Sequence, residues 1–149
     1  MYHAKKFQLC GASIIIFKDQ KVLLQRRRDH NCWGYHGGAV ELGEVVEDAA
    51  KRELLEETGL NAHSITLYGV FSGKEQYHVY PDGNEAYIID IVYICNDFSG
   101  TIENQESEVS ELEWFHMNDL PENLSPPVKS PLLKFCSEQL QGGLVYMYV

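Results

Sequence analysis

The sequence predicts an α/β fold in which a β-sheet is covered by helices on both faces. Residues 87–94 read YIIDIVYI, and such a nearly unbroken apolar run is typical of a strand that is buried on both faces. A helical pattern that begins at Val46 places its apolar residues on one face. Strand patterns lie before and after this helix, and a second helical pattern follows near the C-terminus. This order of elements favours a sheet between helical layers.

The chain begins with a predicted β-hairpin. Residues 9–17 and 22–25 are aliphatic or β-branched runs, separated by the polar turn sequence KDQK. The first strand carries almost no charge, so we expect it to be central. Three arginines then lead into a predicted loop over residues 30–38, which is rich in glycine and aromatic rings. Glycines allow the backbone to approach a metal ion or a phosphate closely.

The helix that begins at Val46 carries carboxylates on or beside its apolar face, at Glu53, Glu56 and Glu57. Gly59 is a natural helix terminator, so these anions also crowd a helix end that disfavours negative charge. Burying unpaired charge is very costly. A bound divalent cation removes these penalties, and hard oxygen ligands favour Mg²⁺ or Mn²⁺ over zinc. The alternative is a solvated acidic helix end.

Three further strands are predicted between this helix and the acidic segment near residue 100. They cover residues 64–73, 77–80 and 86–96, and the sequence PDGN at 81–84 indicates a tight turn. Asp90 interrupts the most apolar of these strands. Its carboxyl group either has a backbone or basic partner or projects into a substrate groove.

The C-terminal part of the chain predicts one more strand and one more helix. The strand covers residues 112–116, and the helix begins with Ser130 as N-cap and Pro131 at its first position. It ends before two glycines at 142–143. Residues 144–149 are a strand, a docking tail or an oligomer contact, so a homodimer is among the expected partners.

Length and composition favour a single-domain enzyme over residues 1–149 and exclude several other classes. The formal net charge of −10 argues against a nucleic-acid polymer as partner, because there is no basic surplus to release counterions. It leaves room for a small nucleotide that binds together with a cation. The four cysteines include no CxxC pair, which disfavours a zinc or dithiol site. We find no signal peptide and no membrane-spanning segment, so the cytoplasm is the expected location.

The stretch over residues 38–60 resembles the Nudix box, the signature of the Nudix hydrolases. Its fixed positions are filled by Gly38, Glu44, Arg52, Glu53, Leu54, Glu56, Glu57, Gly59 and Leu60. A chance match has odds of at most roughly one in a hundred million per window. The resemblance implies the Nudix fold, a mixed sheet between helices. It also implies Mg²⁺- or Mn²⁺-assisted hydrolysis of a diphosphate that is linked to another group.

The resemblance assigns metal ligands within and just before the box. Glu56 and Glu57 are the first-choice ligands, and Glu53 is either a third ligand or the group that orients the attacking water. In relatives, the carbonyl of the residue at Gly37 is commonly a metal ligand. Gly38 opens the box and is expected to lie against the substrate.

Arg52 is expected to orient Glu44 or Glu53 through a charge-assisted hydrogen bond. The chain departs from the family pattern at two positions. His36 stands where relatives usually have proline, so it either relaxes the turn or adds a side chain to the site, with a structural role favoured. Val46 stands where relatives often have a capping Ser or Thr, a loss that typically costs about 1 kcal/mol of stability.

MutT-type relatives suggest further substrate-binding and catalytic residues. Arg26 or Arg27 is the candidate phosphate ligand. Glu108, with Glu106 in reserve, is the candidate for an additional metal ligand or base. Asn123 has either a base-contacting role or a turn role. A nucleobase is expected to stack on the aromatic ring of Trp33, Tyr35 or Tyr77.

The sequence leaves several substrates open. A MutT-like nucleoside triphosphate is the lead. ADP-ribose or another nucleotide sugar is the runner-up, although Gln76 stands where many ADP-ribose members have proline. A tyrosine near Tyr77 occurs in members that split dinucleoside polyphosphates. A nucleotide sensor without catalysis is the alternative class, but sensors usually lose a box residue and all are retained here.

Overall fold

The computed structural model describes residues 4–103 and 109–142. Its elements, in chain order, are β1 (Lys6–Lys18), β2 (Lys21–Arg27), β3 (Trp33–Gly34), β4 (His36–Ala39), α1 (Val46–Thr58), β5 (Asn61–Phe71), β6 (Tyr77–Val79), β7 (Glu85–Ser99), β8 (Val109–His116) and α2 (Pro126–Leu140). The strands predicted after the first helix thus correspond to β5, β6 and β7, with β5 beginning earlier than expected.

The sheet is mixed, as expected. Its centre is the parallel pair β1 and β7, in which Ser13 lies opposite Val92. The other pairs are antiparallel: β2 and β4 join β1, β5 and β6 join β7, and β3 and β8 join β2. The apolar strands predicted to be central therefore form the middle of the sheet.

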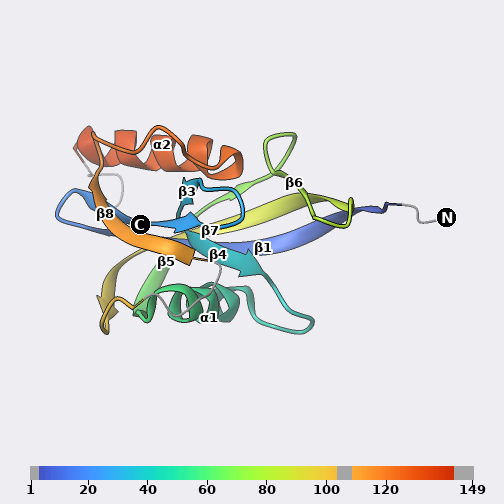
Figure 1. Cartoon of the computed structure of the whole chain (residues 1–149). Helices are drawn as coiled ribbons and strands as arrows, with labels where there is room; N and C mark the ends of the chain where they lie inside the picture. The colour runs from blue at the N-terminus through green and yellow to red at the C-terminus, as the bar shows by residue number, and fades with distance from the viewer. Residues whose placement is uncertain (1–3, 104–108, 143–149) are drawn as a thin grey trace.

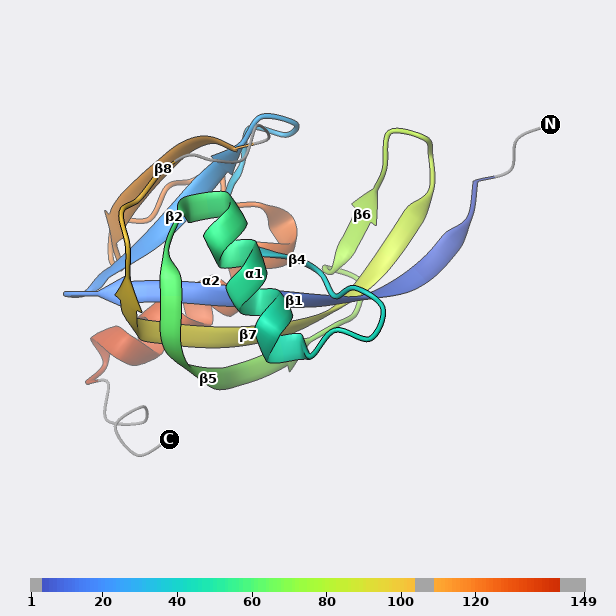
Figure 2. The same cartoon turned by 90° about the horizontal axis from the view of Figure 1, so that it is seen from below.

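The two helices cover opposite faces of the sheet (Figure 1). Seen from below, α1 lies in front of the strands and α2 behind them (Figure 2). Alternate residues of β1 serve the two layers: Ile14 clusters with Leu54 of α1, whereas Ile15 clusters with Phe135 of α2. This alternation follows from the period of two in a strand, and it confirms the expected sandwich.

The segment predicted as a loop over residues 30–38 contains two short strands, so that prediction was wrong in part. The backbone of His36 pairs with Ile14 of β1, and Trp33 pairs with Arg26 of β2. Strands this short have no periodic pattern of their own. Their formation depends on tertiary pairing with β1 and β2.

Helix α1 begins at Val46 and ends at Thr58, and Gly59 follows as its C-cap with a left-handed φ of 82°, so both predicted limits are confirmed. The N-cap residue is Val45 rather than Val46, and it makes no side-chain capping hydrogen bond. The sequence predicts that a capping side chain is missing at Val46. In the structure, the capping position that lacks such a side chain is Val45.

The final helix starts earlier than predicted. Its N-cap is Ser125, and Pro131 lies inside the helix instead of at its first position. Proline has no N–H, so it leaves the carbonyl four residues earlier without its helical partner. That carbonyl belongs to Pro127, and it accepts a hydrogen bond from Nε2 of Gln76 at 2.7 Å. Gln76, which directly precedes β6, thus gives the Pro127 carbonyl the hydrogen bond that Pro131 cannot give. This compensates for a proline that sequence rules place at a helix start.

Candidate active site

The C-terminal half of α1 lies against the glycine pair of β4. The backbone N–H of Gly37 donates to Oε1 of Glu57 at 3.0 Å. A Cβ atom on Gly38 would lie 2.5 Å from Cδ of Glu53, so a side chain there would displace the Glu53 carboxylate. The absence of side chains allows this close approach. The glycines and two of the glutamates singled out from the sequence therefore meet.

Arg52 gathers the other box carboxylates around one guanidinium group. Its Nε and Nη2 donate to the two oxygens of Glu44 at 2.7 and 3.0 Å. Its Nη1 lies 2.9 Å from Glu53 and 3.4 Å from Glu56. The hydrogen bonds from Arg52 lower the pKa of the Glu44 carboxyl to about 2. Both glutamates proposed as partners of Arg52 are therefore in contact with it.

Glu57 is the box glutamate that is buried, with 3 % of its surface exposed. Burial and, next, the charge of Glu53 raise the pKa of its carboxyl to about 8. The Gly37 N–H, Arg27 and a hydrogen bond from Gln25 act in the opposite direction. Nη1 of Arg27 lies 4.0 Å from Oε2 of Glu57. The ionised form of Glu57 thus needs more positive charge than these neighbours supply.

The box residues fit a hard divalent cation by the chemistry of their donors. Glu53, Glu56 and Glu57 offer carboxylate oxygens, and Gly37 adds a backbone carbonyl to the same end of α1. Within the described residues, however, no three acidic, histidine or cysteine side chains are arranged to hold a metal ion. In this arrangement, Nη1 of Arg52 contacts both Glu53 and Glu56. Metal ligation by these residues remains a proposal.

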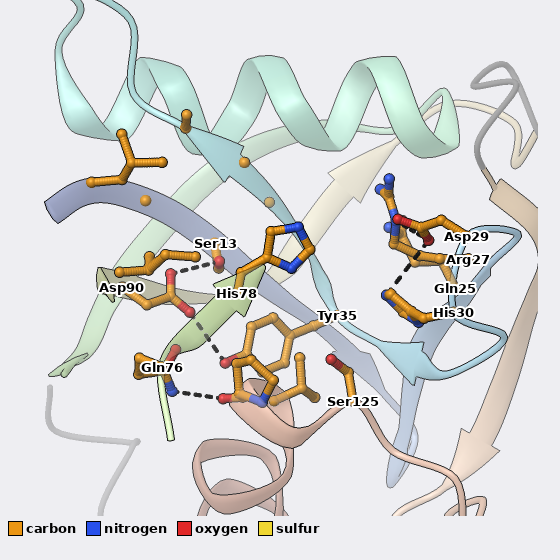
Figure 3. Close-up of a pocket in the computed structure, with 18 of the residues that line it drawn as sticks. Ser13, Gln25, Arg27, Asp29, His30, Tyr35, Gln76, His78, Asp90 and Ser125 are labelled. Carbon is orange, nitrogen blue, oxygen red and sulfur yellow. Dashed lines mark hydrogen bonds and ion pairs between the residues drawn. The ribbon is translucent and has the colours of Figure 1, made fainter. Parts of the chain in front are cut away.

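A pocket of about 310 Å³ opens beside the glycines, on the side of the sheet that carries the start of α2. Figure 3 shows its two polar ends, with Tyr35 between them. One end contains Arg27, Asp29 and His30, and the other contains Ser13, Gln76 and Asp90. The pocket therefore extends from the glycines of β4 to the polar group formed by Ser13, Gln76 and Asp90.

Asp90 faces the pocket and does not have a basic partner among its hydrogen bonds. Ser13 Oγ donates to Oδ1 at 2.7 Å, and the Tyr35 hydroxyl donates to Oδ2 at 3.4 Å. Burial raises the pKa of Asp90, against the effect of these two donors. The sequence left two roles open for Asp90: pairing with a backbone or basic group, or projection into a substrate groove. This geometry agrees with projection into the groove.

His36 is fully buried and does not line the pocket. Its ring nitrogens face Gln25 Oε1 and the carbonyl of Leu23. Burial lowers the pKa of the imidazole to about 4, so the ring is neutral at physiological pH. The structural role favoured for this departure from the family pattern agrees with these contacts.

The two candidate phosphate ligands have different surroundings. Arg27 lines the pocket and lies near Glu57. Arg26 instead pairs with Glu111 of β8 and places its guanidinium 5.6 Å from the ring centre of Trp33. The structure therefore brings Arg27, and not Arg26, to the site.

The three aromatic candidates separate in the same way. Tyr35 lines the pocket. Trp33 is buried against Phe115, with ring centres 4.9 Å apart, and is not among the lining residues. Tyr77 lies on β6, where its hydroxyl donates to Glu85, and it too is outside the lining. Only Tyr35 is brought to the pocket.

Three other sequence candidates remain. Glu108 and Glu106 fall outside the described residues, so their roles stay predictions. Asn123 donates from Nδ2 to the carbonyl of Asn31 at 2.8 Å, which agrees with its turn role.

Sequence reasoning did not single out several polar residues that line the pocket. Among them are Ser13, Gln25 and His78. Ser13 and Gln25 each lie in or at the end of an apolar strand, and a polar residue in such a run is the signal that points to a buried site. His78 carries no comparable signal.

The chain matches the family model of the NUDIX domain over residues 9–135. The chain belongs to the Nudix family. The match extends well beyond the box and includes every strand from β2 to β8. In the described part of this Nudix chain, no helix is long and apolar enough to cross a membrane.

Curated relatives of this Nudix chain carry different substrate names. It is 38 % identical over 110 residues to a protein of Methanocaldococcus jannaschii named ADP-ribose pyrophosphatase. That alignment covers 72 % of this chain but 61 % of the relative, so the relative is the longer protein. It is 32 % identical over 112 residues to the mouse oxidized purine nucleoside triphosphate hydrolase, covering 72 % and 66 % of the two chains.

Solved structures confirm the Nudix fold. The crystal structure of the MutT NUDIX hydrolase from Burkholderia pseudomallei has a TM-score of 0.73 and 30 % sequence identity. The superposition covers 85 % of this chain and 96 % of that one.

Proposed function

We propose that this Nudix chain is an Mg²⁺-dependent pyrophosphohydrolase that cleaves a nucleoside diphosphate linked to another moiety. The observation that carries the proposal is the position of Glu57. Its carboxyl group is buried, is held by the Gly37 N–H, and adjoins a pocket that Arg27 lines. A buried acid with a raised pKa beside a pocket is typical of a functional site.

Glu53, Glu56, Glu57 and the carbonyl of Gly37 are the proposed metal ligands. A divalent cation held there supplies charge neutralisation for the diphosphate and lowers the pKa of a bound water. Mn²⁺ is the expected substitute for Mg²⁺ because it accepts the same oxygen donors.

The remaining roles belong to side chains around this centre. Arg27 binds a phosphate oxygen from the pocket side. Glu53 orients the attacking water or serves as a third ligand, and Arg52 fixes the positions of Glu53 and Glu44. Glu108 stays the proposed additional base or ligand.

A MutT-like nucleoside triphosphate is the proposed substrate. The support comes from the mouse relative, which is named oxidized purine nucleoside triphosphate hydrolase. ADP-ribose is the second candidate, because a relative that is 38 % identical is named ADP-ribose pyrophosphatase. Dinucleoside polyphosphates and a sensor without catalysis stay alternatives. The single domain, the cytoplasmic location and a homodimer stay predictions from the sequence.

The deciding experiment is a phosphate-release and product-chromatography screen with Mg²⁺ in excess. It covers nucleoside triphosphates, ADP-ribose, other nucleotide sugars and diadenosine polyphosphates. The parent protein is compared with Glu57→Gln and with Glu47→Gln, an exposed glutamate of the same helix. We expect one substrate class to be cleaved by the parent and by Glu47→Gln, with a loss of more than about 100-fold in Glu57→Gln.

Binding of a nucleotide with Mg²⁺ but turnover of none would contradict the hydrolase proposal. The sensor without catalysis would then be the better description of the chain.

A further inference from the structure

Asp90 places a carboxylate at the end of the pocket that is remote from Arg27. Only 7 % of its surface is exposed, and it lies on the central strand β7. Each of its oxygens is fixed by a hydroxyl, from Ser13 and from Tyr35. Burying a carboxyl group is costly, and both chain neighbours of Asp90 on β7, Ile89 and Ile91, are apolar. An acid is therefore unusual in this strand.

The carboxylate still has capacity to accept hydrogen bonds. An ionised carboxylate offers about four lone-pair sites on two oxygens, and the two hydroxyls use one on each. Gly11, on the neighbouring strand, lines the pocket together with Asp90 and Gly38. A Cβ atom on Gly11 would lie 3.1 Å from Cγ2 of Ile88, 3.6 Å from Asp90 Oδ1 and 3.7 Å from the carbonyl of Gly38. The pocket thus borders both Asp90 and the glycine that opens the Nudix box.

The surroundings of Asp90 favour a ligand with hydrogen-bond donors and apolar faces. Gln76 uses one N–H of its Nε2 to donate to the Pro127 carbonyl, and its amide oxygen is an acceptor for the donors of a ligand. The walls of the pocket include the apolar side chains of Leu9, Ile88 and Val128. The positive charge of Arg27 lies at the other end (Figure 3). A phosphate therefore suits one end, and a nucleoside suits the other.

We propose that Asp90 is the specificity-determining residue of this enzyme and binds the nucleoside end of the substrate by accepting two adjacent hydrogen bonds. Two groups of a nucleotide offer such paired donors. One is the 2′,3′-diol of ribose, which carboxylates bind in other nucleotide sites. The other is the N1–H and N2–H₂ edge of guanine. The inference rests on the proposed function, since it concerns the substrate of the same site.

The test compares GTP with two analogues, each of which lacks one of these donor groups. ITP lacks the 2-amino group of GTP, and 2′,3′-dideoxy-GTP lacks the diol. The ratios of kcat/KM, GTP to ITP and GTP to dideoxy-GTP, are measured for the parent and for Asp90→Asn. A hydrogen bond to a charged group corresponds to a roughly 10- to 100-fold effect. We expect one ratio to be about 10 to 100 in the parent and close to 1 in Asp90→Asn, and that ratio identifies the recognised group.

The matched control is Asp97→Asn. Asp97 lies on the same strand and also accepts a hydrogen bond from a serine, Ser64, at 3.3 Å, but it is exposed and outside the pocket. Its ratios are expected to equal those of the parent. Tyr35→Phe and Ser13→Ala each remove one hydroxyl from Asp90 and give the result if Asp90→Asn does not fold. Both should lower the same ratio in part.

Two outcomes separate this inference from the proposed function. If the parent cleaves none of the substrate classes in the screen, the hydrolase proposal fails, and the GTP, ITP and dideoxy-GTP ratios are then taken from dissociation constants measured by calorimetry with Mg²⁺. If both ratios are the same in the parent and in the Asp90, Tyr35 and Ser13 variants, by turnover or by binding, then Asp90 is a structural acid and the inference is wrong.

Discussion

The imidazole Nδ1 of His36 lies 2.7 Å from Oε1 of Gln25, and its Nε2 lies 3.1 Å from the carbonyl of Leu23. This buried contact ties β4 to β2 directly before the glycine whose N–H holds Glu57. Gln25 also gives a hydrogen bond to Glu57. His36, which replaces the family's usual proline, therefore contacts Gln25, and Gln25 in turn positions Glu57.

The buried imidazole makes stability depend on pH. The pKa of His36 is lowered to about 4 in the folded protein, against about 6.5 in an unfolded chain. The unfolded chain thus binds an extra proton between these values, so stability is full above pH 6.5 and is lost as the pH falls toward 4. The loss is on the order of 3 kcal/mol.

Chemical unfolding at pH 7, 5.5 and 4 measures this loss. His36→Gln should show a smaller drop than the parent, because its side chain does not titrate. His63→Gln, at an exposed position of β5, controls for the loss of one histidine. Equal drops in the parent and in His36→Gln would contradict the assignment.

Glu57 has the opposite pH dependence. Its pKa is raised to about 8, so the folded protein keeps a proton that the unfolded chain releases above about pH 4.5. The stability that protonated Glu57 contributes to the folded protein is therefore lost as the pH rises from about 4.5 to 8. In a metal chelator at pH 8, Glu57→Gln should have a higher Tm than the parent, and at pH 5 the difference should shrink.

Added Mg²⁺ should raise the Tm of the parent at pH 8 and have little effect on Glu57→Gln, since a ligand that binds only the folded state stabilises it. Glu47→Gln should follow the parent in both conditions. A parent whose Tm does not respond to Mg²⁺ or Mn²⁺ would argue against Glu57 as a ligand.

Arg27 and Arg26 form a matched pair for the phosphate contact. Arg27→Ala removes a cation from the pocket and should raise KM about 10- to 100-fold. Arg26→Ala removes a contact with Glu111 at the surface, so its KM should stay within about 3-fold of the parent. Steady-state kinetics with the substrate from the screen decide between them. The reverse order of effects would move the phosphate site to Arg26.

Arg52→Lys tests the positioning of the box carboxylates. Lysine keeps the charge but cannot reproduce the two parallel hydrogen bonds to Glu44. We expect the affinity for Mn²⁺ to fall about 10- to 100-fold, as is typical when a group that orients metal ligands is lost. Titration followed by electron paramagnetic resonance measures the affinity without turnover. Arg28→Lys, at an exposed position, is the control and should bind Mn²⁺ like the parent.

Much of the fold could be predicted from local patterns. The apolar runs predict β1 and β7, and Gly59 predicts the end of α1. The errors are at places where local rules conflict with distant contacts. Pro131 is typical of a helix start, yet it lies inside α2 because Gln76 satisfies the carbonyl that proline leaves open.

The sequence by itself determined the Nudix box, the helix that carries it and the group of carboxylates that needs positive charge. These features depend on the spacing of residues within one element, and that spacing is visible in the sequence. Tertiary structure alone decided that Arg27 and not Arg26 reaches the pocket, and that Ser13, Tyr35 and Asp90 meet there. These residues come from three different strands or their connections, and only pairing in the sheet sets which side chains share a face.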